Sequence, residues 1–523
     1  MKRPSSSRLS SSPATAAKRV VWAVTLLHVA LMLAYSVLFA SFRGPDEPQH
    51  TDLIRFVKSE ADYPAFDERR LGTAVFRALD EVRFDVPAVR SRDLPEAEAP
   101  LRSGRPSFEV LGSDLETVPD EANQLPSHPP LYYGLAAGYL TAIDWVVPGS
   151  DLLAFDQEVG FLRLLGVLML APLPLLAWAV SRRLGSRPVT GAAASIAVLA
   201  VPQLHHIGAS VSNDNLLTLL VGIVTLLCVR VATGESGIRL AVILGLVTGA
   251  ALLTKAFALF LPLMIVVAYA ISVRRGTAWR TAATSAGIAG LVAFAAGGWW
   301  WARNLIVFGQ IQTGIKLLDA APEGFQPDVG WWVSRYLRFI PWRFWGWFGW
   351  FDVALPALVV VLATALVLVA VLRALAKPPA GPDRIDLLLL LVPTGAIAGL
   401  VAVGAFQGYL RTSFDEGLQG RYLFPGLVGL AVVVASGLGK RGWMPGAVLA
   451  FAAAMQAVAV VTILRFYWGG SPVVGELRAA LAWSPWRPPF LVVGAAILVG
   501  AAIWTTFEVI RFARVSRTRI IVP

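Results

Sequence analysis

Cysteine is almost absent from this chain, since Cys228 is the only one among 523 residues. A single cysteine excludes an intramolecular disulfide, so packing and polar contacts must hold the loops. Charge is scarce as well, because 15% of the residues are charged and 56% are hydrophobic. This balance excludes an ordinary soluble protein and predicts an all-α polytopic membrane protein.

The net charge of +11 comes mainly from arginine, with 38 residues against seven lysines. The arginines stand in short stretches between apolar runs, where the enrichment of basic residues in cytoplasmic loops accounts for them. Nucleic acid is therefore not expected as a partner. The preference for arginine over lysine suggests a GC-rich genome and hence a bacterial source.

The charge pattern also predicts the topology. Five basic residues precede the apolar run 20–42, which is too long for a cleaved signal peptide and predicts a retained helix with a cytoplasmic N-terminus. Residues 1–19 are expected to be a disordered tail, and 20–523 a single transmembrane domain. Two cytoplasmic termini and twelve spans follow: 20–42, 161–181, 188–206, 215–232, 240–255, 257–273, 281–301, 352–372, 385–404, 423–439, 443–464 and 489–510.

One apolar segment, 129–147, conflicts with the charge rule if it crosses the membrane. The arginine cluster after the next span would then lie outside. The segment is better interpreted as an aromatic-edged helix along the outer surface. A long external loop then covers 43–160, and a second, aromatic external loop covers 302–351.

Polar residues collect on the predicted external side. Residues 43–130 hold 18 of the 34 acidic side chains, whereas the cytoplasmic turns hold little besides arginine. The interiors of the predicted spans are nearly free of charge. This distribution places any chemistry at the external boundary and disfavours a transporter, whose site lies near the middle of the membrane.

The first external residues read PDEPQH, 45–50. In one interpretation, Asp46 or Glu47 is only the cap of a helix that starts at Pro48. In the other, the carboxylate is also a general base, fixed between two prolines at the lipid boundary. The polar motifs that accompany it favour the second interpretation.

Further motifs on the same side supply candidate binding residues. Most of these residues also have a purely structural explanation, namely interfacial anchoring, helix capping, snorkelling or an aromatic belt. None of these explains His128. The glycine before Arg421 permits close backbone approach, and an arginine at the lipid boundary suits a phosphate. The candidates are His50, His128, Tyr132, Asn213, Asp214, Lys255, Arg303, Trp345, Arg421 and Tyr422.

In their order and sidedness, these motifs resemble the GT-C superfamily of integral membrane glycosyltransferases. More narrowly, PDEPQH, HPPLYY, the Trp-Gly-Trp-Phe-Gly-Trp stretch and QGRYLFP are similar to a bacterial membrane family of unknown function placed in that superfamily. The resemblance spans residues 44–425. It implies a GT-C-like fold of about twelve spans with external juxtamembrane helices.

The resemblance also implies a reaction. A sugar would pass from a polyprenyl-phosphate carrier to a glycan or lipid-linked acceptor on the outer face of the bacterial cytoplasmic membrane, in cell-envelope glycan synthesis. The catalytic carboxylate of such enzymes corresponds to Asp46, with Glu47 as its neighbour. Arg421, with Arg303 in reserve, would hold the leaving phosphate, and a single base indicates inversion at the sugar carbon.

Some GT-C relatives place a divalent metal near the acidic motif and others do not. The five histidines of this chain show no convincing metal-ligand spacing, so no metal ligand is predicted and the cofactor is left open. Two rival functions also stay open. A transporter or flippase of polyprenyl-linked sugars would share the lipid groove and the aromatic wall, and a phosphotransferase or ligase acting on the same lipid would need a nucleophile or a metal set.

Overall fold

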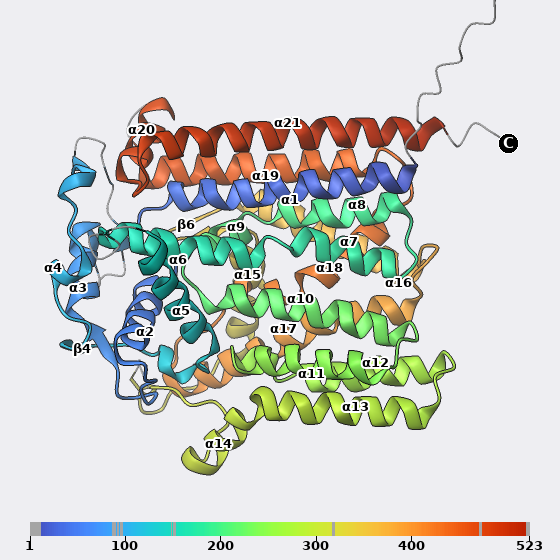
Figure 1. The fold of residues 1–523 in the computed structure, drawn as a ribbon. Helices are drawn as coiled ribbons and strands as arrows, with labels where there is room; N and C mark the ends of the chain where they lie inside the picture. The colour runs from blue at the N-terminus through green and yellow to red at the C-terminus, as the bar shows by residue number, and fades with distance from the viewer. Residues whose placement is uncertain are drawn as a thin grey trace, which may run out of the picture.

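The computed structural model describes residues 12–518, apart from 86–89, 92–93, 95–97, 148, 150–152, 316–318 and 470–472. Long helices run side by side in one bundle, and shorter helices gather at one of its ends (Figure 1). The α-helices are α1 Pro13–Leu38, α2 Glu47–Glu60, α3 Thr73–Glu81, α4 Phe108–Leu111, α5 Leu131–Val146, α6 Phe155–Leu170, α7 Leu173–Arg183, α8 Pro188–Ala197, α9 Pro202–Gly208, α10 Asn213–Ala232, α11 Ile238–Leu252, α12 Leu261–Arg274, α13 Trp279–Ala293, α14 Trp299–Phe308, α15 Val329–Trp345, α16 Ala357–Ala376, α17 Arg384–Thr412, α18 Leu427–Leu438, α19 Met444–Tyr467, α20 Val473–Trp483 and α21 Pro488–Thr518.

Strands are few and short in the described part of the chain. They form two-stranded antiparallel sheets outside the long helices. The pairs are β1 Arg70–Gly72 with β4 Thr117–Ala122, β2 Phe84–Asp85 with β3 Arg90–Ser91, and β5 Trp347–Phe348 with β6 Val353–Ala354.

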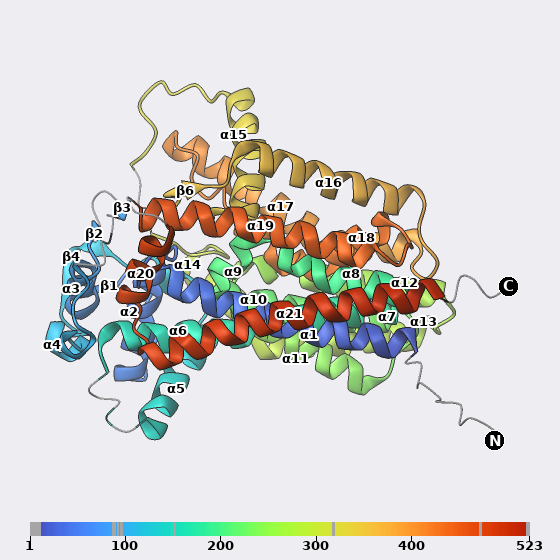
Figure 2. The same ribbon diagram turned by 90° about the horizontal axis from the view of Figure 1, so that it is seen from above.

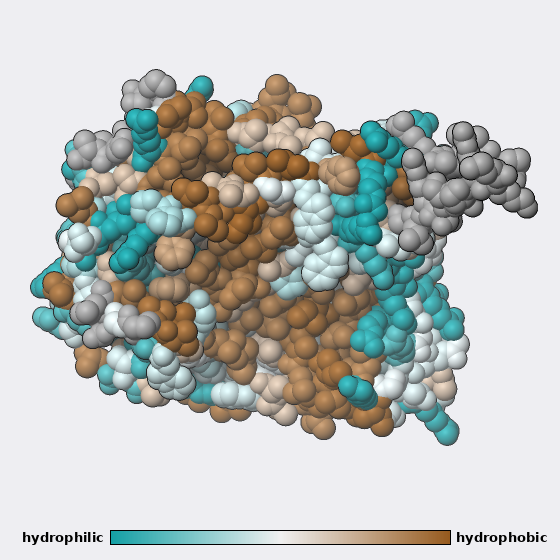
Figure 3. Space-filling view, turned by 45° about the horizontal axis from the view of Figure 1, so that its top comes forward, coloured by the Kyte–Doolittle hydropathy of each residue, from teal (hydrophilic) through white to brown (hydrophobic). Residues whose placement is uncertain are grey.

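The all-α polytopic fold predicted from composition is confirmed. Among the described residues, ten helical segments are long and apolar enough to cross a membrane, and each coincides with one of the twelve predicted spans. Figure 3 shows a broad hydrophobic face over the middle of the bundle, with hydrophilic residues gathered toward its ends. Lipid is the solvent that suits such a surface.

Two predicted spans differ from a straight crossing. In place of 188–206, the helix Pro188–Ala200 and α9 meet at an angle of 68°. Pro202 starts α9 there, and it has no N–H to continue the preceding helix. In place of 240–255, α11 has 15 residues, short of the roughly 20 that a crossing usually needs. The predicted number of twelve spans is therefore approximate.

The chain termini and the short helices lie at opposite ends of the helical bundle. Figure 2 shows that α1 begins and α21 ends at the same end of the molecule, opposite α2, α3 and α4. At that opposite end, α5 packs on α2. It is not among the helices long and apolar enough to cross the membrane. The surface position predicted for 129–147 agrees with this arrangement.

The predicted disordered tail 1–19 is wrong for residues 13–19. Ser12 caps α1, because its hydroxyl accepts a hydrogen bond from the N–H of Thr15 at 3.2 Å. Residues 13–19 are therefore helical. Residues 1–11 lie outside the described part of the chain.

The predicted external loops are also partly helical. α6 begins at Phe155, so the first loop ends before residue 160. The aromatic loop 302–351 contains the last residues of α14 and the whole of α15. α15 begins where the Asp328 carboxylate accepts from the N–H of Trp331 at 2.8 Å. It ends against the segment that carries Arg421.

Candidate active site

Asp46 lies where the chain turns from α1 into α2, at the end of the bundle that carries α2, α3, α4 and α5. Its backbone is left-handed, with φ of 60°, a conformation that Asp and Asn tolerate better than most residues. Its side chain makes no capping hydrogen bond to α2. One carboxylate oxygen instead accepts from Arg421 Nη2 at 2.7 Å, and the other accepts from Gln124 Nε2 at 3.3 Å. The capping alternative therefore does not describe this side chain.

Arg421 stands on a 3-10 helix, η8 Gly420–Gly426, which leads into α18. Gly420 allows η8 to press against the end of α15, since a Cβ at this position would lie 2.2 Å from the carbonyl oxygen of Ile340. The close backbone approach predicted for this glycine is thus present. The Arg421 side chain is buried, and its Nε lies 3.6 Å from Asp214 Oδ2.

Asp214 and Lys255 form a second ion pair beside the first. Ser212, and not the side chain of Asn213 or Asp214, caps α10, because its hydroxyl accepts from the N–H of Asp214 at 3.3 Å. The Asp214 carboxylate accepts from Lys255 Nζ at 2.6 Å, and the Asn213 amide oxygen accepts from the same ammonium at 3.3 Å. Lys255 is buried, so it does not snorkel to the membrane surface.

The four charged groups form one row, Asp46, Arg421, Asp214 and Lys255, in which the sign of the charge alternates. We call these four residues the charged row. Tyr422 lies beneath both cations: its ring centroid is 4.7 Å from Lys255 Nζ and 5.5 Å from the guanidinium carbon of Arg421. Such cation–π contacts hold the two cations without neutralising them.

His50 on α2 and Tyr132 on α5 border the row. His50, one turn into α2, has its Nδ1 3.2 Å from the hydroxyl of Tyr133 on α5. The ring of Tyr132 meets the His50 ring edge-on, with the centroids 5.9 Å apart. Burial, assisted by the charge of Lys255, lowers the pKa of His50 well below its usual value. His50 is therefore a neutral hydrogen-bonding group.

His128 follows the 3-10 helix η3, Leu125–Ser127. Its carbonyl oxygen accepts from the Tyr63 hydroxyl at 2.8 Å, which fixes the backbone. Its Nδ1 is buried without a hydrogen-bond partner. Burial, with a smaller contribution from Lys255, lowers the pKa of His128 to about 3. A buried ring nitrogen without a protein partner is a place for a water molecule or a ligand.

Acid should destabilise the fold through His128. The unfolded chain takes up a proton near the ordinary pKa of 6.5, whereas the folded chain does so only near 3. Stability is therefore fully present above pH 6.5 and falls with decreasing pH, by about 1.4 kcal/mol per unit for one such group. We expect thermal unfolding in detergent at about pH 4.5 to show a smaller acid loss for His128→Gln than for the wild type. An equal loss would contradict the neutral buried state.

Glu47 does not share the surroundings of Asp46, although the two are adjacent in sequence. Its fully buried carboxylate accepts from Arg163 Nε at 2.8 Å and from Arg163 Nη2 at 2.7 Å. It also accepts from the N–H groups of Val211 and Gly44, at 3.0 and 3.2 Å. These contacts tie α2, α6 and the segment before α10 together. They give Glu47 the surroundings of an anchor that positions Asp46.

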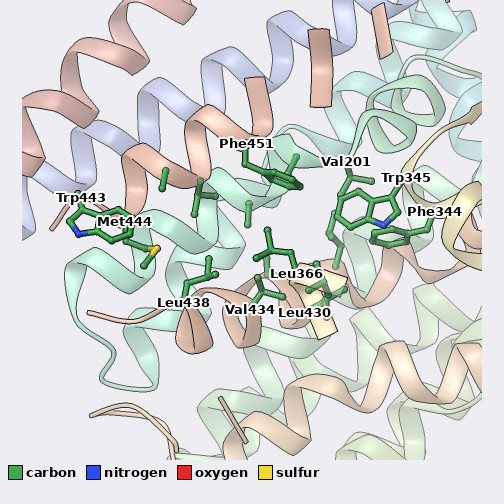
Figure 4. Close-up of a pocket in the computed structure, with 17 residues that line it drawn as sticks. Val201, Phe344, Trp345, Leu366, Leu430, Val434, Leu438, Trp443, Met444 and Phe451 are labelled. Carbon is green, nitrogen blue, oxygen red and sulfur yellow. The ribbon is translucent and has the colours of Figure 1, made fainter. Parts of the chain in front are cut away.

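Arg303 and Trp345 lie apart from the charged row in the contacts that they make. Arg303 stacks on Trp300 and Phe308, 5.2 and 5.3 Å from their ring centroids. Trp345 donates to the Thr364 hydroxyl at 2.9 Å. It also lines an apolar cavity of about 320 Å³ between α8, α15, α16, α18 and α19. Figure 4 shows Phe344 and Trp345 at one end of this cavity and Trp443 at the other.

Sequence reasoning missed several residues that build the site. Arg163 was visible as a charge at the start of a predicted span, which by itself indicates a partner or a function. Tyr133 was hidden because an interfacial tyrosine needs no polar partner, and Tyr63 belongs to none of the motifs. Gln124 carries no signal in the sequence. Among the described residues, no group of three or more His, Cys, Asp and Glu side chains has the arrangement of a metal site.

Comparisons with known proteins give a family. A family model described as "Predicted membrane protein (DUF2142)" matches residues 159–430, more than half of the chain. A comparison with curated proteins found no match.

Solved structures also match the chain, at low sequence identity and with TM-scores under 0.5. ArnT from Cupriavidus metallidurans bound to undecaprenyl phosphate is 14% identical with a TM-score of 0.47, over 96% of this chain and 77% of ArnT. The apo state of the same protein gives 13% and 0.48, over 95% and 78%. The Archaeoglobus fulgidus oligosaccharyltransferase in complex with Zn and sulfate gives 12% and 0.39, over 88% of this chain and 53% of that protein.

Proposed function

We propose that this chain, which belongs to the membrane protein family DUF2142, is a glycosyltransferase. It would move a sugar from a polyprenyl-phosphate carrier to an acceptor on the external face of the bacterial cytoplasmic membrane. The observation that carries the proposal is the 2.7 Å contact between Asp46, a partly exposed carboxylate, and Arg421, a buried cation, at the start of a membrane helix. A base and a phosphate-binding cation are the two groups that such a transfer needs.

The place of the pair suits a reaction between a lipid and a water-soluble molecule. A polyprenyl tail stays in the bilayer, because each buried CH₂ contributes roughly 0.8 kcal/mol. The sugar and the phosphate then lie at the headgroup level. α2 begins there on one side of the site, and η8 and α10 begin there on the other. Only this boundary gives both substrates access.

The chemistry follows from the charges. The acceptor hydroxyl oxygen attacks the sugar carbon that bears the phosphate, and Asp46 takes the hydroxyl proton. The bond from that carbon to the phosphate oxygen breaks, and the oxygen keeps the electron pair. Arg421, with Lys255 next in the row, stabilises the charge that develops on the phosphate. Attack from the side opposite the leaving group inverts the sugar carbon, by analogy with glycosidases that use one base.

Three neighbouring groups suit the sugar and the tail. His128 Nδ1 has no protein partner and suits a sugar hydroxyl. Tyr422 presents an aromatic ring beside the cations. Leu427, the first residue after η8, lines the apolar cavity, and the ring of Phe344, which also lines it, meets the ring of Phe424 of η8 edge-on with the centroids 5.7 Å apart. This cavity has room for the first isoprene units of a tail whose phosphate is held at Arg421.

The proposed orientation places both termini in the cytoplasm and the end with α2 outside. Ser103, on the short 3-10 helix Arg102–Gly104, and Ala278, in the turn before α13, are exposed residues on the two proposed sides. In a Cys228→Ser background, a membrane-impermeant thiol reagent applied to intact cells should label Ser103→Cys and spare Ala278→Cys until the cells are opened. The reverse labelling would place the charged row in the cytoplasm and exclude the proposed donor side.

A panel of donors tests the function itself. Membranes that contain the wild-type chain should consume one polyprenyl-phosphate sugar of the panel and release polyprenyl phosphate, whereas membranes with Asp46→Asn should not. No consumption of any donor, with the wild-type chain folded, would contradict a transferase. It would favour the second candidate, a flippase of polyprenyl-linked sugars, which needs the apolar cavity but no base.

A further inference from the structure

Arg421 contacts the proposed base, Asp46, and is also the proposed ligand of the donor phosphate. Its Nη2 already donates to Asp46 at 2.7 Å, and its Nη1 donates to the carbonyl oxygen of Pro45 at 3.5 Å. Its Nε is buried without a hydrogen-bond partner. The Arg421 side chain is 4% exposed and that of Asp46 is 25% exposed. The carboxylate is therefore the more accessible member of the pair, and an arriving anion meets it before the guanidinium.

The charges of the row balance one another. Two carboxylates, Asp46 and Asp214, face two cations, Arg421 and Lys255. A phosphate group that enters adds at least one negative charge to a largely buried place. Burying an unpaired charge is costly, so the phosphate is held well only if a carboxylate gives up its cation.

Asp46 is the carboxylate that can release its cation. Asp214 is buried and bound to Lys255 at 2.6 Å, and its withdrawal would leave a buried ammonium unpaired. Asp46 stands on a turn, is partly exposed, and has Gln124 Nε2 at 3.3 Å to hold its other oxygen. It can therefore leave Arg421 and keep both solvent and a hydrogen-bond donor.

We propose that Asp46 and Arg421 block each other through their ion pair, and that the donor phosphate opens the pair by taking over Arg421. The released carboxylate then serves as the base for the acceptor hydroxyl. The donor accordingly binds before the acceptor can be activated, and no unpaired base faces water in the absence of the donor. The identity of the phosphate rests on the proposed function, whereas the exchange needs only an anion.

Binding without turnover tests the exchange. The purified chain would be titrated with two probes, a polyprenyl phosphate that carries no sugar and inorganic phosphate. The variants are Asp46→Asn, Arg421→Ala and the control Asp120→Asn, an exposed acid on β4. Asn tolerates the left-handed backbone of residue 46, so the fold is kept. Removing a charge-assisted competitor should tighten phosphate binding about tenfold to a hundredfold in Asp46→Asn. Arg421→Ala should lose binding, and the control should match the wild type.

Each outcome decides something. Tighter binding of both probes by Asp46→Asn supports the exchange and the lipid donor. Tighter binding of inorganic phosphate alone supports the exchange and contradicts the polyprenyl-phosphate donor. Unchanged or weaker binding of both probes by Asp46→Asn overturns the exchange. If the wild type still binds the lipid in that case, the proposed function survives without it.

Discussion

Asp46→Asn is expected to lower turnover about 10² to 10⁴-fold, the usual contribution of a general base. The reason is that asparagine cannot accept the proton of the acceptor hydroxyl, although it has the same size and tolerates the same backbone. Because Arg421 stays in place, the loss should appear in kcat and not as weaker donor binding. The measurement is single-turnover consumption of the donor lipid at saturating concentration.

The matched control is Asp120→Asn, which removes an exposed carboxylate from the same outer region. It should leave turnover within about twofold of the wild type, since surface changes away from a site usually have small effects. An Asp46→Asn protein that is folded and fully active would show that this carboxylate is not the base.

Arg163→Met should cost about 3–5 kcal/mol of stability, the usual penalty for removing one partner of a buried ion pair. Glu47 would be left as a buried anion without a cation. Arg163 also donates to the carbonyl oxygens of Phe39 and Ala40, at 2.7 and 2.8 Å, where α1 ends. We expect a large fall in the thermal unfolding midpoint in detergent, and a partial recovery when Glu47→Gln is added.

An exposed ion pair of the same length serves as the control. Lys58 and Asp144 are 2.7 Å apart with side chains 27% and 37% exposed, and such pairs contribute about 0–1 kcal/mol. Lys58→Ala should therefore change the midpoint little. If Arg163→Met proved as mild as Lys58→Ala, Glu47 would not be an anchor, and a direct role beside Asp46 would regain support.

The membrane fold could be predicted because its causes are local in the sequence. Apolar runs of sufficient length must be helices in lipid, since no water satisfies their backbone groups. The run that ends at Arg274 and the run that starts at Arg384 became helices for this reason. The bend at Pro202 had a visible cause too, but the length of the run concealed it.

The pairings within the site could not be predicted in the same way. The motifs around Asp46 and Arg421 stand out in the sequence, but the two residues are 375 positions apart. Nothing in the local sequence indicates that their side chains touch. PDEPQH also holds two adjacent carboxylates. Arg163 of α6 packs against the first turn of α2 and buries Glu47, whereas the side chain of Asp46 stays partly exposed. Only the tertiary structure distinguishes an anchor from a base.

Transfer in sealed vesicles tests the central claim most directly. The purified chain would be reconstituted with a polyprenyl-phosphate sugar labelled in the sugar, together with an acceptor extract from the cell envelope. The account predicts that the wild type yields label on a new molecule and an equal amount of polyprenyl phosphate, and that Asp46→Asn yields neither. Label that stays on the polyprenyl carrier and crosses the bilayer equally well with both proteins would contradict it.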